Sequence, residues 1–134
     1  MKSYLNHLQV NINPINLNFY KKLMAFLGWK IIIQGKNHAG YKSGTNGELW
    51  FEKSLKNHKS DYDNFGVNHI AIGVEKIEDV DKTTAYLTKQ KIKPLFGTPK
   101  HRPEFCNTVS CYYQVMFESP DHILFEILYI KPKK

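Results

Sequence analysis

The feature that most constrains the fold of this sequence is a short segment that occurs twice. Leu5–Ile12 reads LNHLQVNI and Val67–Val74 reads VNHIAIGV, and their histidines, His7 and His69, lie 62 residues apart. An internal repeat of this kind indicates an architecture built from two copies of one supersecondary unit. Both segments alternate apolar and polar residues as a half-buried strand does. We therefore expect each histidine on the face opposite the apolar row.

A helix is predicted after each repeated strand. In the first half Asn13 can cap the helix, Pro14 suits its first turn and Gly28 can end it. Its predicted apolar stripe has residues four apart, namely Ile15, Phe19, Leu23 and Leu27. The second helix is predicted from about Glu78 to Gln90, with a buried side formed by Val80, Thr84 and Leu87.

Three strand-like segments follow each helix. They are Trp29–Gln34, His38–Ser43 and Glu48–Lys53 in the first half, and Ile92–Thr98, Ser110–Glu118 and Ile123–Ile130 in the second. We predict an α+β fold in which two βαβββ modules form a curved mixed sheet around a central cavity, with the helices outside. The 134 residues would form one domain, with module one at about 1–54, a polar linker at 55–66 and module two at 67–134. Each module alone would bury only a marginal core, so the modules should pair.

Composition and charge narrow the class of protein. Apolar residues make up 42% of the chain, charged residues make up 23%, and no apolar run approaches the roughly 18 residues that a membrane helix needs. The N-terminus enters a strand pattern without a signal peptide, so we expect a cytoplasmic protein with no membrane partner. The formal charge of +7 comes from dispersed lysines and one arginine, Arg102. This distribution is typical of a solvated surface rather than of a nucleic-acid site, and an anionic small molecule would also suit the charge. Cys106 and Cys111 form no metal-binding motif and are expected to be reduced thiols.

The face opposite the apolar rows carries the residues that can perform chemistry. Glu126 alternates with Phe125 and Ile127, so its carboxylate is predicted on the inner face, where an unpaired charge is costly. In the last strand of module one, the predicted inward residues are Glu48, Trp50 and Glu52. Histidine and carboxylate ligands together suit Zn²⁺, Ni²⁺, Fe²⁺ or Mn²⁺. A metal-free polar cavity is the alternative interpretation.

These residues resemble a known pattern. The two strand-borne histidines, FYKKLMAFLGWK at Phe19–Lys30 and SPDHILFEI at Ser119–Ile127 resemble the vicinal-oxygen-chelate superfamily of glyoxalase I, bleomycin-resistance proteins and extradiol dioxygenases. The segments AGYKSGTNGELWFE, GVNHIAIGVEKIEDVD and YYQVMFESPDHILFEI are similar to small glyoxalase-like members. The resemblance covers nearly the whole chain.

The resemblance implies a divalent metal cofactor (Zn, Ni, Fe or Mn), a small-molecule substrate and a homodimer. It implies metal ligands at His7, Glu52, His69 and Glu126, with Glu48 as the alternative to Glu52. A ligand carboxylate, Glu126 or Glu52, would also be the catalytic base. Further candidate contacts to a substrate are Trp50, Arg102, Phe105 and Tyr112.

The sequence departs from the family pattern in two details of its motifs. The usual DPDG turn is Ser119–His122, which affects the turn rather than the site. Gln9 and Asn11 stand near the position of an arginine found in glutathione-using members, which argues against lactoylglutathione as the substrate.

Three functions remain open. The favoured one is a metal-dependent glyoxalase-like lyase or isomerase that acts on a small oxygenated or thiol-conjugated molecule and uses four protein ligands. The second is an Fe(II) extradiol-type dioxygenase, which needs only two histidines and one carboxylate. The third is a non-catalytic small-molecule binding or resistance protein with an aromatic cavity. Fold alone does not choose among them.

Overall fold

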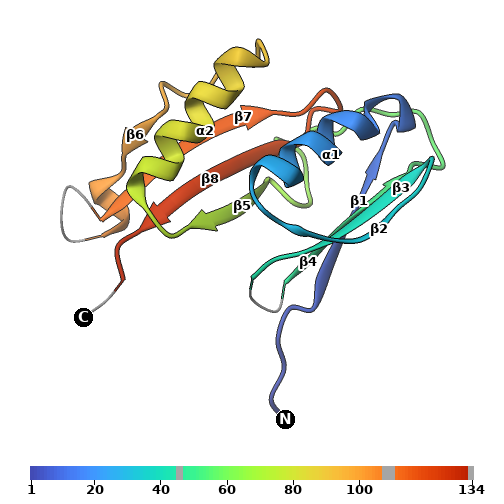
Figure 1. The fold of residues 1–134 in the computed structure, drawn as a ribbon, viewed down its shortest axis with the longest axis horizontal. Helices are drawn as coiled ribbons and strands as arrows, with labels where there is room; N and C mark the ends of the chain where they lie inside the picture. Colours follow the sequence, from blue (N-terminus) through green and yellow to red (C-terminus); the bar gives the residue numbers. More distant parts are fainter. Residues whose placement is uncertain (45–46, 107–110, 133–134) are drawn as a thin grey trace. The chain divides into compact units, whose positions relative to one another are not determined.

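Two compact units, Met1–Lys59 and Ser60–Lys134, make up the computed structural model, which describes residues 1–44, 47–106 and 111–132 (Figure 1). Each unit contains one four-stranded mixed sheet and one α-helix. The predicted α+β fold with two βαβββ modules is therefore confirmed. Each sheet is open rather than closed on itself.

The first unit contains the elements β1 (His7–Ile12), η1 (Pro14–Asn16), α1 (Leu17–Phe26), β2 (Lys30–Gln34), β3 (His38–Lys42) and β4 (Glu48–Lys53). Its strand order is β1-β4-β3-β2. β1 runs parallel to β4, and the other pairs are antiparallel. The Asn13 side chain accepts a hydrogen bond from the Ile15 backbone N–H, and Gly28 follows the helix at a φ of 75°. Asn13 thus caps the 3₁₀ turn η1 rather than α1 itself, whereas the prediction of Gly28 at the helix end is confirmed.

The second unit repeats this plan with β5 (His69–Val74), α2 (Ile77–Lys89), β6 (Lys100–His101), η2 (Pro103–Phe105), β7 (Tyr112–Glu118) and β8 (Leu124–Ile130). Its strand order is β5-β8-β7-β6, and β5 is parallel to β8. The helix α2 packs on β5, β7 and β8. This unit is therefore a second copy of the same module.

The pleat of the strands separates a core row from a polar row in each unit. In the first unit Tyr20 of α1 stacks on Phe51 of β4 with ring centroids 4.5 Å apart. In the second unit Phe117 of β7 stacks on Phe125 of β8 at 5.6 Å. The predicted helix-facing rows of the last strands are buried as expected.

Three predictions about local structure are wrong. The buried side of α2 contains Thr83 in place of Thr84. Ile15 does not join the buried stripe of the first helix: it lies in η1 and is 82% exposed, and the buried residues of α1 are Leu17, Tyr20, Leu23 and Met24. The α-helix begins two residues later than the stripe assumed, because a 3₁₀ turn precedes it and rotates the buried face.

The segment Ile92–Thr98 is also not a strand. Pro94 has no backbone N–H to donate, and both Phe96 and Gly97 adopt a positive φ that takes the chain out of extended conformation. The first strand after α2 is instead the short β6 at Lys100–His101, which pairs with β7.

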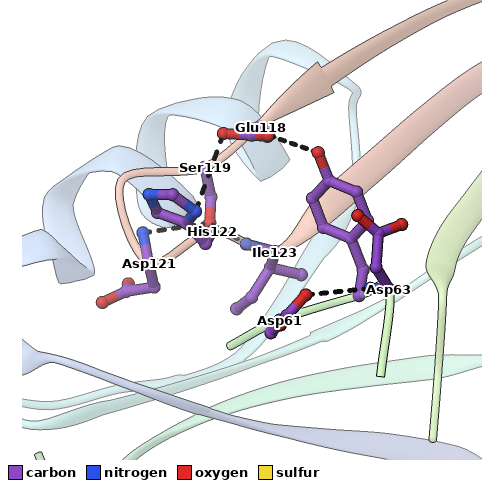
Figure 2. Close-up of polar contacts among 8 residues, drawn as sticks. Asp61, Asp63, Glu118, Ser119, Asp121, His122 and Ile123 are labelled. Carbon is purple, nitrogen blue, oxygen red and sulfur yellow. Dashed lines mark hydrogen bonds and ion pairs between the residues drawn. The ribbon is translucent and has the colours of Figure 1, made fainter. Parts of the chain in front are cut away.

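The turn between β7 and β8 is held by side-chain contacts rather than by glycine (Figure 2). The Ser119 hydroxyl oxygen accepts hydrogen bonds from the backbone N–H groups of Asp121 (3.3 Å) and Ile123 (3.1 Å). His122 has a φ of 59°, the left-handed conformation that glycine would favour. At the start of the turn, Glu118 accepts a hydrogen bond from the hydroxyl of Tyr62 at 2.5 Å.

The cysteines differ from the sequence prediction. Cys106 and Cys111 are joined in a disulfide with their Cα atoms 6.1 Å apart, a separation that such a bond can span. The prediction of reduced thiols rested on a cytoplasmic location, which itself remains a prediction. Within the described ranges, no helix is both long and apolar enough to cross a membrane.

Candidate active site

One face of the second unit's sheet forms the floor of a pocket. Alternate residues of β7 and β8 point to this face because successive side chains of a strand alternate. They are Tyr112, Gln114 and Met116 on β7, and Leu124 and Glu126 on β8. The other row of these two strands, with Val115, Phe117, Phe125 and Ile127, is fully buried in the core.

The pocket has a volume of about 510 Å³, within the range of small-molecule sites. It contains five residues that the sequence predicted for the site: His69, Arg102, Phe105, Tyr112 and Glu126. It also contains polar residues that sequence reasoning missed, Tyr62, Asn68 and Gln114. Gln114 could have been predicted from the sequence, because it is a lone amide in the apolar strand YYQVMF.

Glu126 is the most buried ionisable side chain of this pocket, at 3% exposure. Its Oε1 accepts a hydrogen bond from the Tyr112 hydroxyl at 2.7 Å, and its Oε2 lies 3.0 Å from Nε2 of His69. Burial, and then the hydrogen bond to Glu126, raise the pKa of Tyr112 above its ordinary value, so this hydroxyl stays a donor. The carboxylate is thus buried with two polar partners, as a buried charge requires.

His69 is oriented by a chain of hydrogen bonds. The amide Nδ2 of Asn68 donates to the Tyr62 carbonyl at 2.8 Å, which turns Asn68 Oδ1 toward His69 Nδ1, also at 2.8 Å. Because Oδ1 can only accept, Nδ1 of His69 carries a hydrogen. The other ring nitrogen, Nε2, then faces Glu126 Oε2 at 3.0 Å. The first unit repeats this feature, with His7 Nδ1 2.8 Å from Asn6 Oδ1.

Arg102 lies beside this pair and is linked to it by Gln114. With the Gln114 amide in the orientation that satisfies both neighbours, its nitrogen donates to Glu126 Oε1 and its oxygen accepts from Arg102 Nη1 at 3.0 Å. The Arg102 guanidinium carbon lies 4.4 Å from the centre of the Phe105 ring. The polar part of the pocket is therefore one connected network from the guanidinium to the imidazole.

The strand register of the first unit shows which residue corresponds to Glu126. In the second unit His69 pairs with Leu124, and Glu126 follows two residues later. In the first unit His7 pairs with Glu48, and the residue two positions later is Trp50. The position that matches Glu126 is therefore Trp50, whereas Glu48 and Glu52 lie one pleat repeat before and after it.

Trp50 is fixed in this position by its neighbours. Its indole Nε1 donates to Glu48 Oε2 at 3.0 Å. Its ring lies against Gly40 of β3 so closely that a Cβ atom there would sit 2.7 Å from two ring carbons. Glu52 pairs with Asn11 and His38 at the far end of β4. The indole thus occupies the place where a carboxylate ligand from module one would stand.

A comparison with protein families identifies the wider group. The model of the Glyoxalase/Bleomycin resistance protein/Dioxygenase superfamily matches residues 5–127. The chain belongs to this superfamily.

Solved structures of low sequence identity share the fold of this superfamily member. A candidate glyoxalase from Bacillus halodurans has 23% identity and a TM-score of 0.77, with 93% of this chain and 94% of that chain covered. A glyoxalase/dioxygenase from Nostoc punctiforme has 14% identity and a TM-score of 0.74, with 96% and 92% covered. A glyoxalase/bleomycin resistance protein from Albidiferax ferrireducens T118 has 18% identity and a TM-score of 0.72, with 95% and 99% covered. A comparison with curated proteins gave no match.

The donor atoms of this superfamily member can be tested against a metal ion. Across the described ranges, no three His, Cys, Asp or Glu side chains cluster as a metal site. His69 and Glu126 nevertheless have the form of a ligand pair, since the second ring nitrogen of His69 is held by an acceptor as metal-bound histidines usually are. Trp50 offers no ligand atom. At the register position of the first unit that matches Glu126, the chain thus carries no metal-ligating side chain.

Proposed function

We propose that this chain is a metal-dependent enzyme that performs acid–base chemistry on a small oxygenated molecule, as a glyoxalase-like lyase or isomerase. The observation that carries the proposal is Glu126, a carboxylate at 3% exposure on the floor of a pocket. A buried carboxylate beside an imidazole is suited to accept a proton from substrate carbon.

The residues of the second unit have distinct roles in this proposal. Glu126 accepts the proton from substrate carbon and returns it to a neighbouring substrate atom. His69 presents Nε2, 3.0 Å from Glu126 Oε2, as its ligand atom. Tyr112 holds the carboxylate in place through its hydroxyl. A divalent ion, Zn, Ni, Fe or Mn, would be held by His69 and Glu126, with His7 as the further ligand that the family resemblance implies, and would supply Lewis-acid stabilisation of substrate oxygens.

A second candidate function, an extradiol-type dioxygenase, is favoured by Trp50. Four-ligand sites need a carboxylate from each module, but the register places an indole at the first-module position. Two histidines and one carboxylate are the ligand set of non-haem Fe(II) oxygenases. The two functions differ in the metal that supports activity and in the need for oxygen.

Elemental analysis of protein purified without an affinity tag or added metal tests the proposal. We expect about one divalent ion per chain, lost in His69→Ala and in Glu126→Gln. His58→Ala, which removes an exposed histidine, is the matched control and should keep the metal. The bound metal then selects the assay: loss of a carbon-bound proton for Zn or Ni, and oxygen uptake with catechols for Fe.

Protein that stays metal-free after incubation with all four ions would overturn both enzyme functions. Non-catalytic binding of a small molecule would then be the remaining hypothesis. If metal binds and Glu126→Gln retains turnover within about tenfold of wild type, Glu126 is not the base, because positioned general bases contribute about 10²- to 10⁴-fold.

A further inference from the structure

The only arginine of the chain lies in the pocket. The sequence has 19 lysine and arginine residues, and Arg102 is the single arginine among them. Its side chain is 24% exposed and lines the pocket on the same side as Tyr112 and Gln114. A lysine would serve for surface charge alone, whereas arginine presents a planar fork of donors. The position of Arg102 therefore points to recognition of a planar anion.

Three contacts hold the Arg102 guanidinium in a fixed plane. Nε donates to Glu104, Nη1 donates to Gln114, and the Phe105 ring lies beneath the guanidinium carbon at 4.4 Å. The hydrogen bonds use two of the five N–H groups of the side chain. The remaining donors are oriented in advance, which lowers the entropy cost of binding a ligand.

The walls of the pocket are aromatic and apolar. Phe96 and Phe105 both line it and are 55% and 57% exposed, unusually high values for phenylalanine. Phe105 also contacts the Tyr112 ring edge to face at 5.2 Å. Leu124 and Met116 complete the apolar lining. A ligand with an aromatic body would cover the two exposed rings and gain the hydrophobic free energy of their burial.

Glu126 limits the charge that such a ligand can carry. It stands one side chain away from Arg102, across Gln114. Without a metal ion on Glu126, a second negative charge on the ligand would meet this buried carboxylate and be repelled. A carboxylate matches the two parallel donors of the guanidinium fork and adds a single charge, which a phosphate dianion exceeds.

We infer that the pocket of the second unit binds an aromatic monocarboxylate, with the carboxylate on Arg102, the ring against Phe96 and Phe105, and the reacting end toward Glu126. This inference deepens the proposed function by naming the class of substrate. Its recognition residues, however, are separate from the proposed catalytic pair.

Three probes that differ only in the charge at one end test the inference: 3-phenylpropionate, 3-phenylpropionamide and 3-phenylpropylamine. Their dissociation constants are measured by titration of the ¹⁵N-labelled protein in NMR. We expect the carboxylate to bind about tenfold or more tighter than the amide, since hydrogen bonds to charged groups contribute about 1.5–3 kcal/mol. The amine should bind most weakly.

Variants assign the preference to one side chain. Arg102→Gln should bring the carboxylate down to the affinity of the amide, and Arg102→Lys should retain part of the preference as a point charge. Lys100→Gln removes an exposed positive charge two residues away and should leave the preference intact. Equal affinities of carboxylate and amide for the wild type, no binding of any probe, or an unchanged preference in Arg102→Gln would each overturn the inference.

Glu126→Gln separates this inference from the proposed function. A variant that keeps the carboxylate preference while the wild type proves metal-free and inactive would support the pocket specificity and reject the enzyme. Metal binding and turnover in a protein without carboxylate preference would do the reverse.

Discussion

The orientation of the His69 imidazole depends on the residue before it. Asn68 Oδ1 accepts from Nδ1, and the Tyr62 carbonyl fixes the Asn68 amide in turn. The first unit repeats the Asn–His pair with the same 2.8 Å contact between Asn6 and His7. The same Asn–His contact therefore recurs at the start of the first strand of each module.

Asn68→Ala should free the His69 ring. Without its acceptor, Nδ1–H loses the contact that sets the tautomer, so the ¹⁵N chemical shifts of the two ring nitrogens should move toward averaged values. Metal affinity should fall about tenfold or more, as is typical when the outer partner of a metal-binding histidine is removed. Asn6→Ala, the matched change in the other module, should leave the His69 shifts unchanged. Identical ring shifts in Asn68→Ala and wild type would show that Asn68 does not set the tautomer.

At the scale of the elements, the sequence of a strand predicts which side of the sheet each residue faces, but it does not predict the register between strands. Alternation in β1, β4 and β5 was readable because each of these strands buries one face, which fixes the side of every residue. Strand β8 is buried on both faces, and there Glu126 was found as the lone carboxylate of an apolar strand. The pairing partner of a residue is not contained in its own strand. From the sequence, Glu48 and Glu52 were therefore both candidates to correspond to Glu126. Only the register of β4 against β1 shows that Trp50 is the residue in the corresponding position.

Other errors at this scale also have physical causes. β6 has two residues, too few for a period-two pattern to emerge from its neighbours. The network around Glu126 joins Tyr62, Gln114 and Arg102 from separate segments, so no local pattern announces it. His69 and Glu126 were predicted because each is a polar residue on the inner row of its strand, whereas Tyr112 was predicted as an aromatic residue that could line the cavity.

Trp50→Glu should add a carboxylate in module one at the position where the wild type has an indole. The new side chain would stand at the register position that matches Glu126. We expect Zn²⁺ or Ni²⁺ affinity, measured by competition with a chelating dye, to rise about tenfold or more, because each added anionic ligand favours such sites. Trp50→Phe removes the indole without adding a ligand and should not raise affinity. If both variants bind metal as the wild type does, the correspondence of Trp50 with a ligand position is wrong.

Gly40 makes room for the same indole, so Gly40→Ala should destabilise the first unit. Its Cβ would approach the Trp50 ring to 2.7 Å, and relief requires movement of a large ring. A loss of about 1–3 kcal/mol in unfolding free energy is expected for overpacking of this kind. Urea unfolding followed by tryptophan fluorescence measures it, since Trp29 and Trp50 both lie in this unit. Gly47→Ala, where the nearest atom is 3.6 Å away, should cost much less. Equal losses in the two variants would contradict the steric explanation.

The whole molecule also presents an exposed strand edge, which bears on the proposed homodimer. All five residues of β2 are exposed, and β2 is an edge of its sheet. Antiparallel pairing of two copies about Ile32 would place Ile31 opposite Ile33 and Lys30 opposite Gln34, without facing like charges. We expect Ile32→Lys to shift the protein from dimer to monomer in sedimentation velocity, whereas Lys22→Gln, on the exposed side of α1, should not. A wild type that is monomeric at 100 µM or so would rule out this dimer.

The free energy of folding of the whole chain should also respond to alkaline pH through Tyr62. The hydrogen bond to Glu118 is the main cause that raises the pKa of Tyr62 to about 12, whereas a tyrosine in the unfolded chain titrates near 10. Between these values the unfolded chain releases a proton that the folded protein keeps. The folded state then binds more protons, so stability falls as pH rises from 10 to 12.

Tyr62→Phe removes this linked proton. Its melting temperature, followed by circular dichroism, should therefore decline less steeply than that of the wild type between pH 10 and 12, although it starts lower at pH 8 through loss of the hydrogen bond. Tyr4→Phe, at a residue that is 75% exposed, is the control and should follow the wild-type slope. Parallel declines in wild type and Tyr62→Phe would mean that the contact between Tyr62 and Glu118 does not persist in solution. The segment that carries Asn68 would then be held at the pocket by other contacts.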